Sequence, residues 1–337
     1  MAGRPCGLSI SLAWYLIKNK LLGRKRFPLA MILEPLEKCN LACEGCGRIR
    51  EYESVMDRMM TVEDCLAAAQ ECDAPVVSIS GGEPLLHPDI NDIVAGIVRQ
   101  RRFVYLCTNG LLMKQALKLL KPSRYFAFVV HVDGLRETHD RTVARRGVYD
   151  VAIGAIEMAR REGFRVCTNT TLYKGTHPEE FHTLFALLTG MGVEGIMVSP
   201  AFQYQEQDKD IFLARQEAVI FFRDVLEGCS YDTRFYNNPL YLDFLRGKRQ
   251  YQCRQWAMPT RTPLGWRQPC YLIADQHVAS FDELMETTAW DSYGFGRDPR
   301  CATCMMHCGY EASTIFEAME KPRVALEMAT RSLLLGP

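Results

Sequence analysis

The chain has 337 residues, of which 48% are hydrophobic, and this is enough to bury a large core in one or two domains. Lysine plus arginine equals aspartate plus glutamate at 40 each, so no overall charge favours a nucleic acid partner. Fourteen cysteines without a signal peptide favour metal ligation in a reducing cytoplasm over a secreted disulfide scaffold, and no apolar run is long enough to span a membrane.

Residues 1–27 form an N-terminal segment with a basic, amphipathic helix expected over residues 8–26. Its apolar residues are Leu8, Ile10, Leu12, Trp14, Tyr15, Leu16, Ile17, Leu21 and Leu22, and its basic residues are Lys18, Lys20, Arg24, Lys25 and Arg26. Such a helix can lie in a membrane interface, which would place the protein peripherally at the inner face of the membrane. The alternative is a helix packed on the bottom of the following domain, with a solvated basic end.

Residues 28–228 alternate between apolar runs and helical patterns. The expected strands are 28–36, 75–80, 103–108, 125–132, 164–172 and 193–199, and the expected helices are 61–72, 88–100, 113–120, 149–162, 178–191 and 211–227. Strands that alternate with helices indicate parallel pairing with right-handed crossovers. The pattern therefore predicts an α/β fold, a partial (β/α)6 TIM-type barrel, with its chemistry at the carboxyl ends of the strands.

Three cysteines follow the first expected strand in a C-x3-C-x2-C pattern at Cys39, Cys43 and Cys46. A cubane 4Fe-4S cluster normally takes four cysteine ligands, so three would leave one iron without a protein ligand. An open iron can bind a small molecule through its amine and carboxylate. A structural zinc site is the alternative interpretation, although zinc usually takes two C-x2-C-like pairs.

Polar residues follow the remaining strands, where they would face the mouth of the barrel. The second strand ends in Gly81-Gly82-Glu83-Pro84, in which the glycines permit close backbone approach and the carboxylate can accept hydrogen bonds from an ammonium group. The other strand-end candidates are Thr108, Asn109, Asp133, Asn169 and Ser199. Each of these could instead serve as a turn or helix cap.

The cysteine motif followed by GGEP resembles the radical S-adenosylmethionine (SAM) enzymes. The resemblance implies a 4Fe-4S cluster on Cys39, Cys43 and Cys46, and a SAM amino group held by the GGEP residues. It also implies contacts from Thr108, Asn109, Asp133, Asn169 and Ser199 to the ribose, carboxylate or adenine of SAM. The family usually has an aromatic residue before the last cysteine, where this chain has Gly45, and this departure predicts weaker packing around the adenine.

Residues 229–337 break the alternation and become rich in aromatic residues, proline and cysteine, which predicts a smaller second unit. Five cysteines stand here, at Cys253, Cys270, Cys301, Cys304 and Cys308. Radical SAM enzymes often carry a second 4Fe-4S cluster in such an extension. A zinc site and free thiols remain as alternatives, and the spacing does not indicate which four cysteines would bind a metal.

Longer stretches resemble the radical SAM enzymes of hopanoid biosynthesis in particular. They include MILEPLEKCNLACEGCGRI, FVYLCTNGLL, PTRTPLGWRQPCYLI and CATCMMHCGYEA, whereas residues 201–210 look less typical. This resemblance implies an apolar polycyclic alkene as substrate, diploptene, and a flavodoxin or ferredoxin-type reductant. The 5′ carbon of SAM would be joined to the terminal alkene.

Cys107, at the end of the third strand, is a candidate hydrogen-atom donor for the carbon radical that such an addition leaves. Buried cysteines are otherwise commonly just small apolar residues. Two further hypotheses remain open at this point. The enzyme could act on a different alkene or on a peptide, or the protein could be a non-catalytic iron-sulfur or metal-binding protein.

Overall fold

The computed structural model describes residues 6–47, 52–204 and 210–334. Residues 201–210, which look least typical of the family, therefore lie partly outside the described residues. None of the described helices combines the length and the apolar content that crossing a membrane requires.

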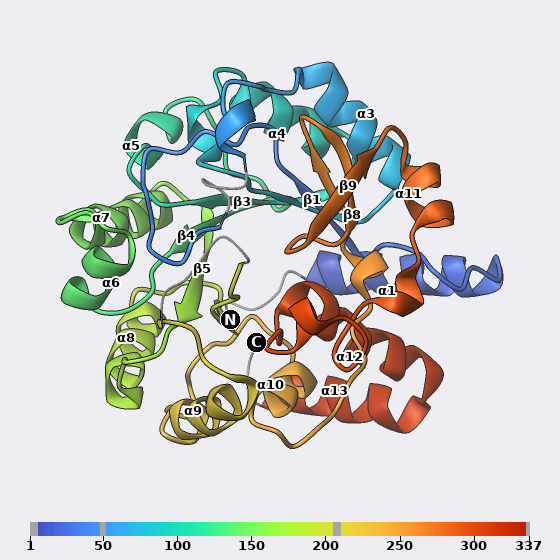
Figure 1. The fold of residues 1–337 in the computed structure, drawn as a ribbon. Helices are drawn as coiled ribbons and strands as arrows, with labels where there is room; N and C mark the ends of the chain where they lie inside the picture. Colours follow the sequence, from blue (N-terminus) through green and yellow to red (C-terminus); the bar gives the residue numbers. More distant parts are fainter. Residues whose placement is uncertain (1–5, 48–51, 205–209, 335–337) are drawn as a thin grey trace.

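One nine-stranded sheet runs through the molecule in the order β6-β5-β4-β3-β2-β1-β7-β8-β9 (Figure 1). Its first six strands are β1 (Ala30–Leu33), β2 (Val76–Ile79), β3 (Phe103–Thr108), β4 (Phe126–His131), β5 (Arg165–Leu172) and β6 (Ile196–Pro200). All six pair in parallel with their sequence neighbours. These strands confirm the predicted partial barrel, and they bring the polar strand ends to one edge.

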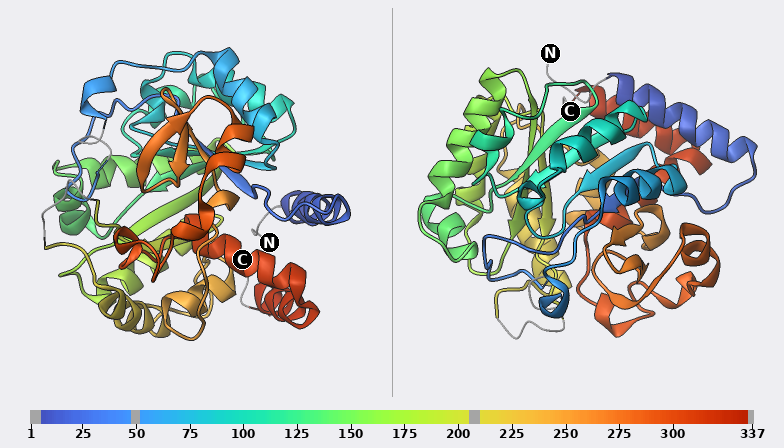
Figure 2. Two further views of the ribbon diagram at one scale, coloured as in Figure 1. Left: turned by 45° about the vertical axis from the view of Figure 1, so that its right-hand side comes forward. Right: turned by 90° about the horizontal axis from the view of Figure 1, so that it is seen from above.

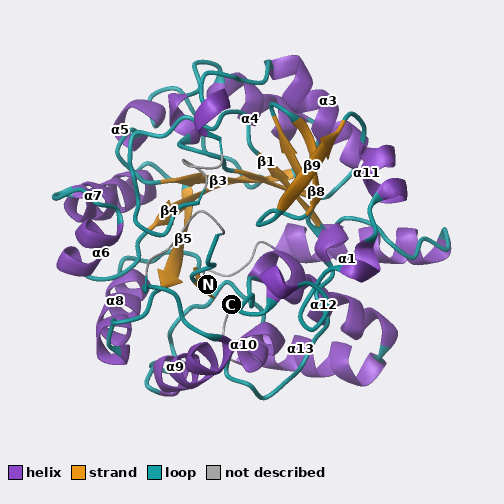
Figure 3. Ribbon diagram, in the orientation of Figure 1, coloured by secondary structure: helices purple, strands orange, loops and turns teal. Residues whose placement is uncertain are grey.

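Helices cover the outside of this curved sheet (Figure 3). They are α3 (Val62–Cys72), α4 (Ile90–Arg99), α5 (Met113–Ala116), α6 (Arg136–Thr142), α7 (Val148–Arg161), α8 (Pro178–Gly190) and α9 (Arg215–Glu227). Only α6 was not expected from the sequence. Its seven residues, RETHDRT, carry no apolar period, so hydrophobic patterning could not reveal it.

Side chains that alternate along the strands form two apolar layers, one under the helices and one inside the barrel. Val104 and Leu106 of β3 pack outward with the helices in the main core, whereas Phe103 and Tyr105 point into the barrel. The inward cluster also contains Leu8, with Cys107 packed against it. The barrel interior is therefore apolar at the amino ends of the strands, and Cys107 lies at the carboxyl end of the same inward row.

Helix α1 (Cys6–Leu21) closes the bottom of the barrel. One face of it buries Leu8, Tyr15 and Asn19, and Tyr15 meets Phe27 at a ring distance of 5.9 Å. Phe27 in turn packs on Phe316 at 5.1 Å, which ties α1 to the C-terminal region. One face of this helix thus packs on the bottom of the domain, at the periphery of the molecule, and its other face is exposed (Figure 2).

The C-terminal region continues the same sheet. Its strands are β7 (Thr260–Thr262), β8 (Gly265–Pro269) and β9 (Ala274–Val278), and its helices are α10 (Pro239–Leu245), α11 (Phe281–Thr287), α12 (His307–Glu320) and α13 (Pro322–Leu334). Strand β7 pairs in parallel with β1, through Ile32 and Thr260, and β8 and β9 follow in antiparallel fashion. The second region is therefore joined to the barrel by backbone hydrogen bonds at β1.

Candidate active site

The loop of Cys39, Cys43 and Cys46 follows β1 at the carboxyl edge of the sheet, and all three residues line one large cavity. Leu41 anchors the loop in a small apolar cluster with Val143 and Val148. The amide of Glu44 donates a hydrogen bond of 2.8 Å to the carbonyl of Thr142. These contacts fix a loop whose three thiols face the cavity side.

The thiols of Cys39 and Cys43 stand in surroundings that disfavour an isolated thiolate. Burial raises the pKa of Cys39 to about 11 and also raises the pKa of Cys43, and repulsion from the neighbouring sulfurs adds to both shifts. A bound metal centre removes that penalty by providing the positive charge.

No three potential ligands among the described residues converge as a single ion requires.

The Gly81-Gly82 turn lies directly against the backbone that leads into the cysteine loop. A Cβ on Gly81 would lie 2.3 Å from the Leu36 carbonyl oxygen, and one on Gly82 would lie 2.1 Å from that of Lys38. Gly81 also has φ +104°, a conformation that favours glycine. Both glycines line the cavity, so this turn offers bare backbone to a ligand beside the cysteines.

Glu83 connects the ends of β2 and β3. Its carboxylate, almost fully buried, accepts hydrogen bonds from the Thr108 hydroxyl at 2.9 Å and the Asn109 amide at 2.8 Å. Asn109 then donates a hydrogen bond of 2.7 Å to Asn40 of the cysteine loop. Burial raises the pKa of Glu83 and these hydrogen bonds lower it. Thr108 and Asn109 thus hold Glu83 and the loop in place, and all three line the cavity.

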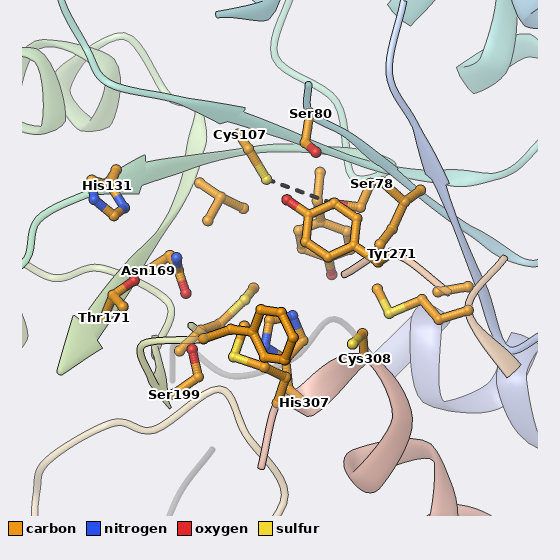
Figure 4. Close-up of a pocket in the computed structure, with 18 of the residues that line it drawn as sticks. Ser78, Ser80, Cys107, His131, Asn169, Thr171, Ser199, Tyr271, His307 and Cys308 are labelled. Carbon is orange, nitrogen blue, oxygen red and sulfur yellow. Dashed lines mark hydrogen bonds between the residues drawn. The ribbon is translucent and has the colours of Figure 1, made fainter. Parts of the chain in front are cut away.

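The cavity has a volume of about 470 Å³ and extends from the cysteine loop into the barrel. Asn169 and Ser199 both lie on its wall, as predicted (Figure 4). The Asn169 Oδ1 and Ser80 Oγ atoms are buried without a hydrogen-bond partner. Such unpaired groups are unfavourable unless a ligand completes them, so they indicate where polar parts of a bound molecule would lie.

Two of the predicted SAM contacts do not reach this wall. Pro84 begins a short 3-10 helix behind Glu83, and its ring is buried away from the cavity. The Asp133 carboxylate pairs with His131 at 2.7 Å and accepts a hydrogen bond from the Thr171 amide at 2.8 Å. His131 lines the cavity where Asp133 does not. Burial lowers the His131 pKa, but attraction to the Asp133 carboxylate and the hydrogen bond to it outweigh this and raise the pKa overall.

Gly45 lies beneath an aromatic ring that comes from another element. A Cβ on Gly45 would lie 2.5 Å from the nearest ring carbon of Tyr173, the residue that follows β5. Tyr204 packs in the same way over Gly47, at 2.1 Å from the position of a Cβ. Both tyrosines line the cavity. Two large aromatic side chains from other parts of the chain therefore occupy the space directly beside the glycines of the cysteine loop.

Cys107 faces the cavity at the end of β3. Its sulfur lies 3.6 Å from the Ser78 hydroxyl oxygen, an interaction drawn in Figure 4. Burial raises the Cys107 pKa to about 11, while the hydrogen bond from Ser78 opposes that shift. The residue is therefore a protonated thiol at neutral pH.

The five C-terminal cysteines surround a second, smaller cavity. Cys301, Cys304 and Cys308 come from one stretch, and Cys253 and Cys270 come from two others. Cys308 stands in the first turn of α12, where the helix dipole favours negative charge. A Cβ on Gly309 would lie 2.1 Å from the Cys253 sulfur, so glycine permits that sulfur to approach. Burial, followed by repulsion from the other four sulfurs, raises the Cys253 pKa. Cys308 lines both cavities, and it therefore forms part of the wall between them.

Comparison with known families assigns the barrel. The model of the radical SAM superfamily matches residues 33–188, which hold the cysteine loop and strands β2 to β5. These residues form a radical SAM domain. The cofactors of a radical SAM domain are a 4Fe-4S cluster and SAM, and the three thiols and the bare glycine turn fit them. A second model, described as a domain of unknown function (DUF3463), matches residues 196–328.

Curated relatives match about half of the chain. A GTP 3′,8-cyclase of Aquifex aeolicus is 28% identical over 186 residues, which cover 51% of this chain and 57% of that protein. An AdoMet-dependent heme synthase of Methanosarcina barkeri is 30% identical over 182 residues, which cover 48% and 52%. The chain thus spans about half the length of the curated relatives that it matches.

Solved structures share the fold over most of the chain. Streptococcus suis SuiB has a TM-score of 0.67 at 17% identity, covering 90% of this chain and 78% of its own. The protein anSMEcpe, solved with AdoMet and a peptide, has a TM-score of 0.61 at 15% identity, covering 90% and 99%. At these identities the likeness concerns the fold alone.

Several residues of the cavity wall were not predicted from the sequence. They are Ser78, Ser80, His131, Thr171, Tyr173 and His307. His131 shares the inward row of β4 with Val129, so strict alternation back from the strand end could have identified it. Tyr173 and His307 carry no local pattern, because only the tertiary fold brings them to the cysteine loop.

Proposed function

We propose that this radical SAM enzyme joins the 5′ carbon of SAM to the terminal alkene of a hopene, diploptene, and so acts as an adenosylhopane synthase in hopanoid biosynthesis. One observation carries the proposal. The cavity that begins at the cysteine loop continues past Cys107 into an apolar interior, lined by Leu8, Leu12, Leu29, Ile32, Val129, Met197 and Ile315. A polar head and a long apolar end in one cavity suit SAM beside a polycyclic alkene.

The charged groups of the cavity support an apolar acceptor over a nucleotide. Its carboxylates are Glu83 and Glu311, and among the described residues neither lysine nor arginine lines it. A triphosphate such as that of GTP is normally held by cationic side chains or backbone amides. A peptide or another alkene is the alternative acceptor, and analysis of the reaction products by mass spectrometry distinguishes these cases.

The chemistry of the cofactors sets what the protein must provide. When bound, the cluster supplies one electron that divides SAM into methionine and a 5′-deoxyadenosyl radical. Addition of the 5′ carbon to the CH2 end of the alkene forms one carbon-carbon bond and leaves a tertiary carbon radical. Glu83, Asn169 and Ser199 hold SAM in this proposal, and the apolar interior keeps the alkene in line and excludes water.

Cys107 completes the reaction by giving its thiol hydrogen atom to the tertiary carbon. A thiol, not a thiolate, is needed for that transfer, and burial, which raises the Cys107 pKa, supports the thiol form even though the Ser78 contact lowers that pKa. The sulfur radical that remains takes up one electron and one proton. A flavodoxin or ferredoxin-type reductant would provide both electrons of the cycle, and solvent would provide the proton.

The C-terminal cysteines would hold a second 4Fe-4S cluster. All five cysteines line one small cavity, and burial together with repulsion between the sulfurs raises the Cys253 pKa, a penalty that a bound metal centre would relieve. A cytoplasmic location with peripheral contact at the inner face of the membrane completes the proposal.

Product analysis tests this function. Reduced, reconstituted protein is incubated with SAM and diploptene, and the products are identified by mass spectrometry. We expect methionine and adenosylhopane in equal amounts, with 5′-deoxyadenosine only as a minor leak. Abundant 5′-deoxyadenosine with unchanged diploptene would contradict the proposal, and so would an adduct formed only with a different alkene or a peptide.

A further inference from the structure

Helix α1 carries a second apolar face that contacts no part of the described chain's core. Ile10, Trp14, Ile17 and Leu21 form it, and we call these four residues the outer face of α1. They recur at intervals of four, three and four residues, so they lie on one side of the helix. Trp14 is 68% exposed and Leu21 is 81% exposed. A regular row of large apolar residues is unusual on a surface that faces only water.

Basic side chains border this outer face on both sides. At 100° per residue, Lys18 lies about 80° to one side of Ile10 and Lys20 about 80° to the other. Lys18 stands 3.5 Å from Asp73, and Lys20 donates to the carbonyl of Met319. Both lysines therefore sit at the boundary between the outer face and the protein body.

Three more cations, Arg24, Lys25 and Arg26, are exposed just after the helix. Arg26 lies 3.3 Å from the exposed carboxylate of Asp291. Apolar residues with tryptophan at the centre and lysines at the edges match the chemistry of a lipid surface whose headgroups are anionic.

The opposite face of the same helix reaches the active-site cavity. Leu8 and Leu12 line its apolar end, together with Ala312 and Ile315 of α12. A helix with its side chains is about 10 to 12 Å across. A lipid surface in contact with the outer face would therefore lie within about one helix diameter of the cavity.

We propose that the outer face of α1 docks the protein on an anionic lipid bilayer, with Trp14 at the interface and the flanking lysines beside the headgroups. Docking in this way would bring the apolar end of the cavity to the membrane that contains the alkene, a consequence that rests on the proposed function. The docking itself depends only on α1. A second copy of the chain fits the outer face less well, because the basic borders of two such faces would repel each other.

Trp14 provides a direct probe of this contact. The other three tryptophans, Trp256, Trp266 and Trp290, are buried. Vesicles of phosphatidylglycerol and phosphatidylcholine in equal parts should therefore shift the fluorescence of wild-type protein to the blue and should carry it along in a flotation assay. Pure phosphatidylcholine vesicles should bind much less protein, and raising the salt from about 0.15 M to about 1 M should weaken binding, since it shortens the screening length.

Matched variants identify the surface. Replacing Ile10, Trp14 and Leu21 by Gln should lower vesicle binding by about tenfold or more, because three large apolar side chains are lost from the interface. The control replaces Leu119, Ile220 and Tyr231 by Gln. These three large side chains are also exposed, and they lie far from α1 in the sequence. Equal binding of the two variants would overturn the proposal. A blue shift that needs high protein concentration and no vesicles would also overturn it, in favour of self-association.

Turnover measurements distinguish membrane docking by α1 from the identity of the substrate. With diploptene in detergent micelles, the α1 variant should be as active as wild type, whereas with diploptene in anionic vesicles it should be slower. If neither the wild type nor the α1 variant converts diploptene, in micelles or in vesicles, the proposed substrate is wrong. The flotation assay would still test membrane docking. Equal rates on vesicles would contradict the role of docking in substrate access.

Discussion

The two cysteine groups of this protein differ in how the chain builds them. Cys39, Cys43 and Cys46 come from one loop and face a cavity of about 470 Å³. The C-terminal group combines Cys301, Cys304 and Cys308 of one stretch with the distant Cys253 and Cys270, and the five surround a small cavity of their own. A contiguous loop with three ligands leaves room for a reactant, whereas a group assembled by tertiary folding surrounds its site. The first arrangement suits catalysis, and the second suits structure or electron transfer.

Replacing Cys39, Cys43 and Cys46 together by Ala should have the largest effect, because it removes every protein ligand of the open cluster. Cleavage of SAM should fall to the level of a protein-free control in an anaerobic assay by liquid chromatography. The matched control replaces Cys65, Cys72 and Cys229, which belong to neither group. Continued SAM cleavage by the first variant would refute the assignment of the loop.

Replacing Cys301 and Cys304 by Ala should mainly affect folding, since metal binding contributes folding free energy in cysteine-rich units. We expect less soluble protein, a lower melting temperature, and a fall in iron from about eight to about four atoms per chain. Metal analysis of protein purified without reconstitution measures this directly. Stoichiometric zinc would replace the second cluster by a zinc site, and unchanged metal content would favour free thiols.

Cys107→Ala should separate the two halves of the reaction. Cleavage of SAM should stay largely intact, while the saturated adduct should fall by about tenfold, equivalent to about 1.4 kcal/mol in the barrier, or change its stereochemistry. In deuterated water the wild type should place deuterium at the quenched carbon, because a thiol exchanges its hydrogen with solvent. Cys167→Ala, on the inward row of β5, two strands away from Cys107, is the control. Wild-type yield and stereochemistry from Cys107→Ala would eliminate it as the donor.

Tyr173→Leu should weaken SAM binding by about tenfold, because an aromatic stacking partner contributes about 0.5–1.5 kcal/mol beyond its buried area. Tyr173→Phe should bind nearly as well as wild type. Titration of SAM into anaerobic protein by calorimetry measures both without turnover. If the Leu variant keeps the wild-type dissociation constant, the ring beside Gly45 does not contact the bound SAM.

The smallest expected effect concerns pH. Burial raises the Cys107 pKa from 9 to about 11 in the folded protein, so the thiol form persists to higher pH than in the unfolded chain. Any stabilisation from the neutral thiol is present below pH 9 and is lost as the pH rises through 11. The share of saturated adduct should therefore stay constant from neutral pH to about pH 10 and fall above it. A fall already near pH 8 would mean that the donor has an ordinary thiol pKa.

The sequence predicted the barrel and the open cysteine loop because both depend on local patterns. Strands β1 to β6 alternate with amphipathic helices, and the C-x3-C-x2-C and GGEP motifs are short and contiguous. It did not predict that β7 would pair with β1, since a three-residue strand, TRT, carries no apolar period. The contact of Tyr173 with Gly45 joins residues 128 positions apart, and no local signal precedes it.

Strand-end polarity alone could not separate ligand-binding residues from structural ones. Asp133 and Thr108 both follow apolar runs, yet Asp133 pairs with His131 behind the wall while Thr108 holds Glu83. The direction of each side chain depends on the register between strands and on the loop that follows. Only the hydrogen-bond partners in the folded chain distinguish the role of Asp133 from that of Thr108.

Electron paramagnetic resonance on two half-site variants tests the contrast between the cysteine groups most directly. In one variant the five C-terminal cysteines are replaced by Ala, so that Cys39, Cys43 and Cys46 remain. In the other, these three are replaced and the C-terminal five remain. Each is reduced anaerobically and measured with and without SAM. An open iron on the first group predicts that SAM changes the spectrum of the first variant and leaves that of the second unchanged. A SAM-dependent change in the second variant alone, or in neither, would contradict the account.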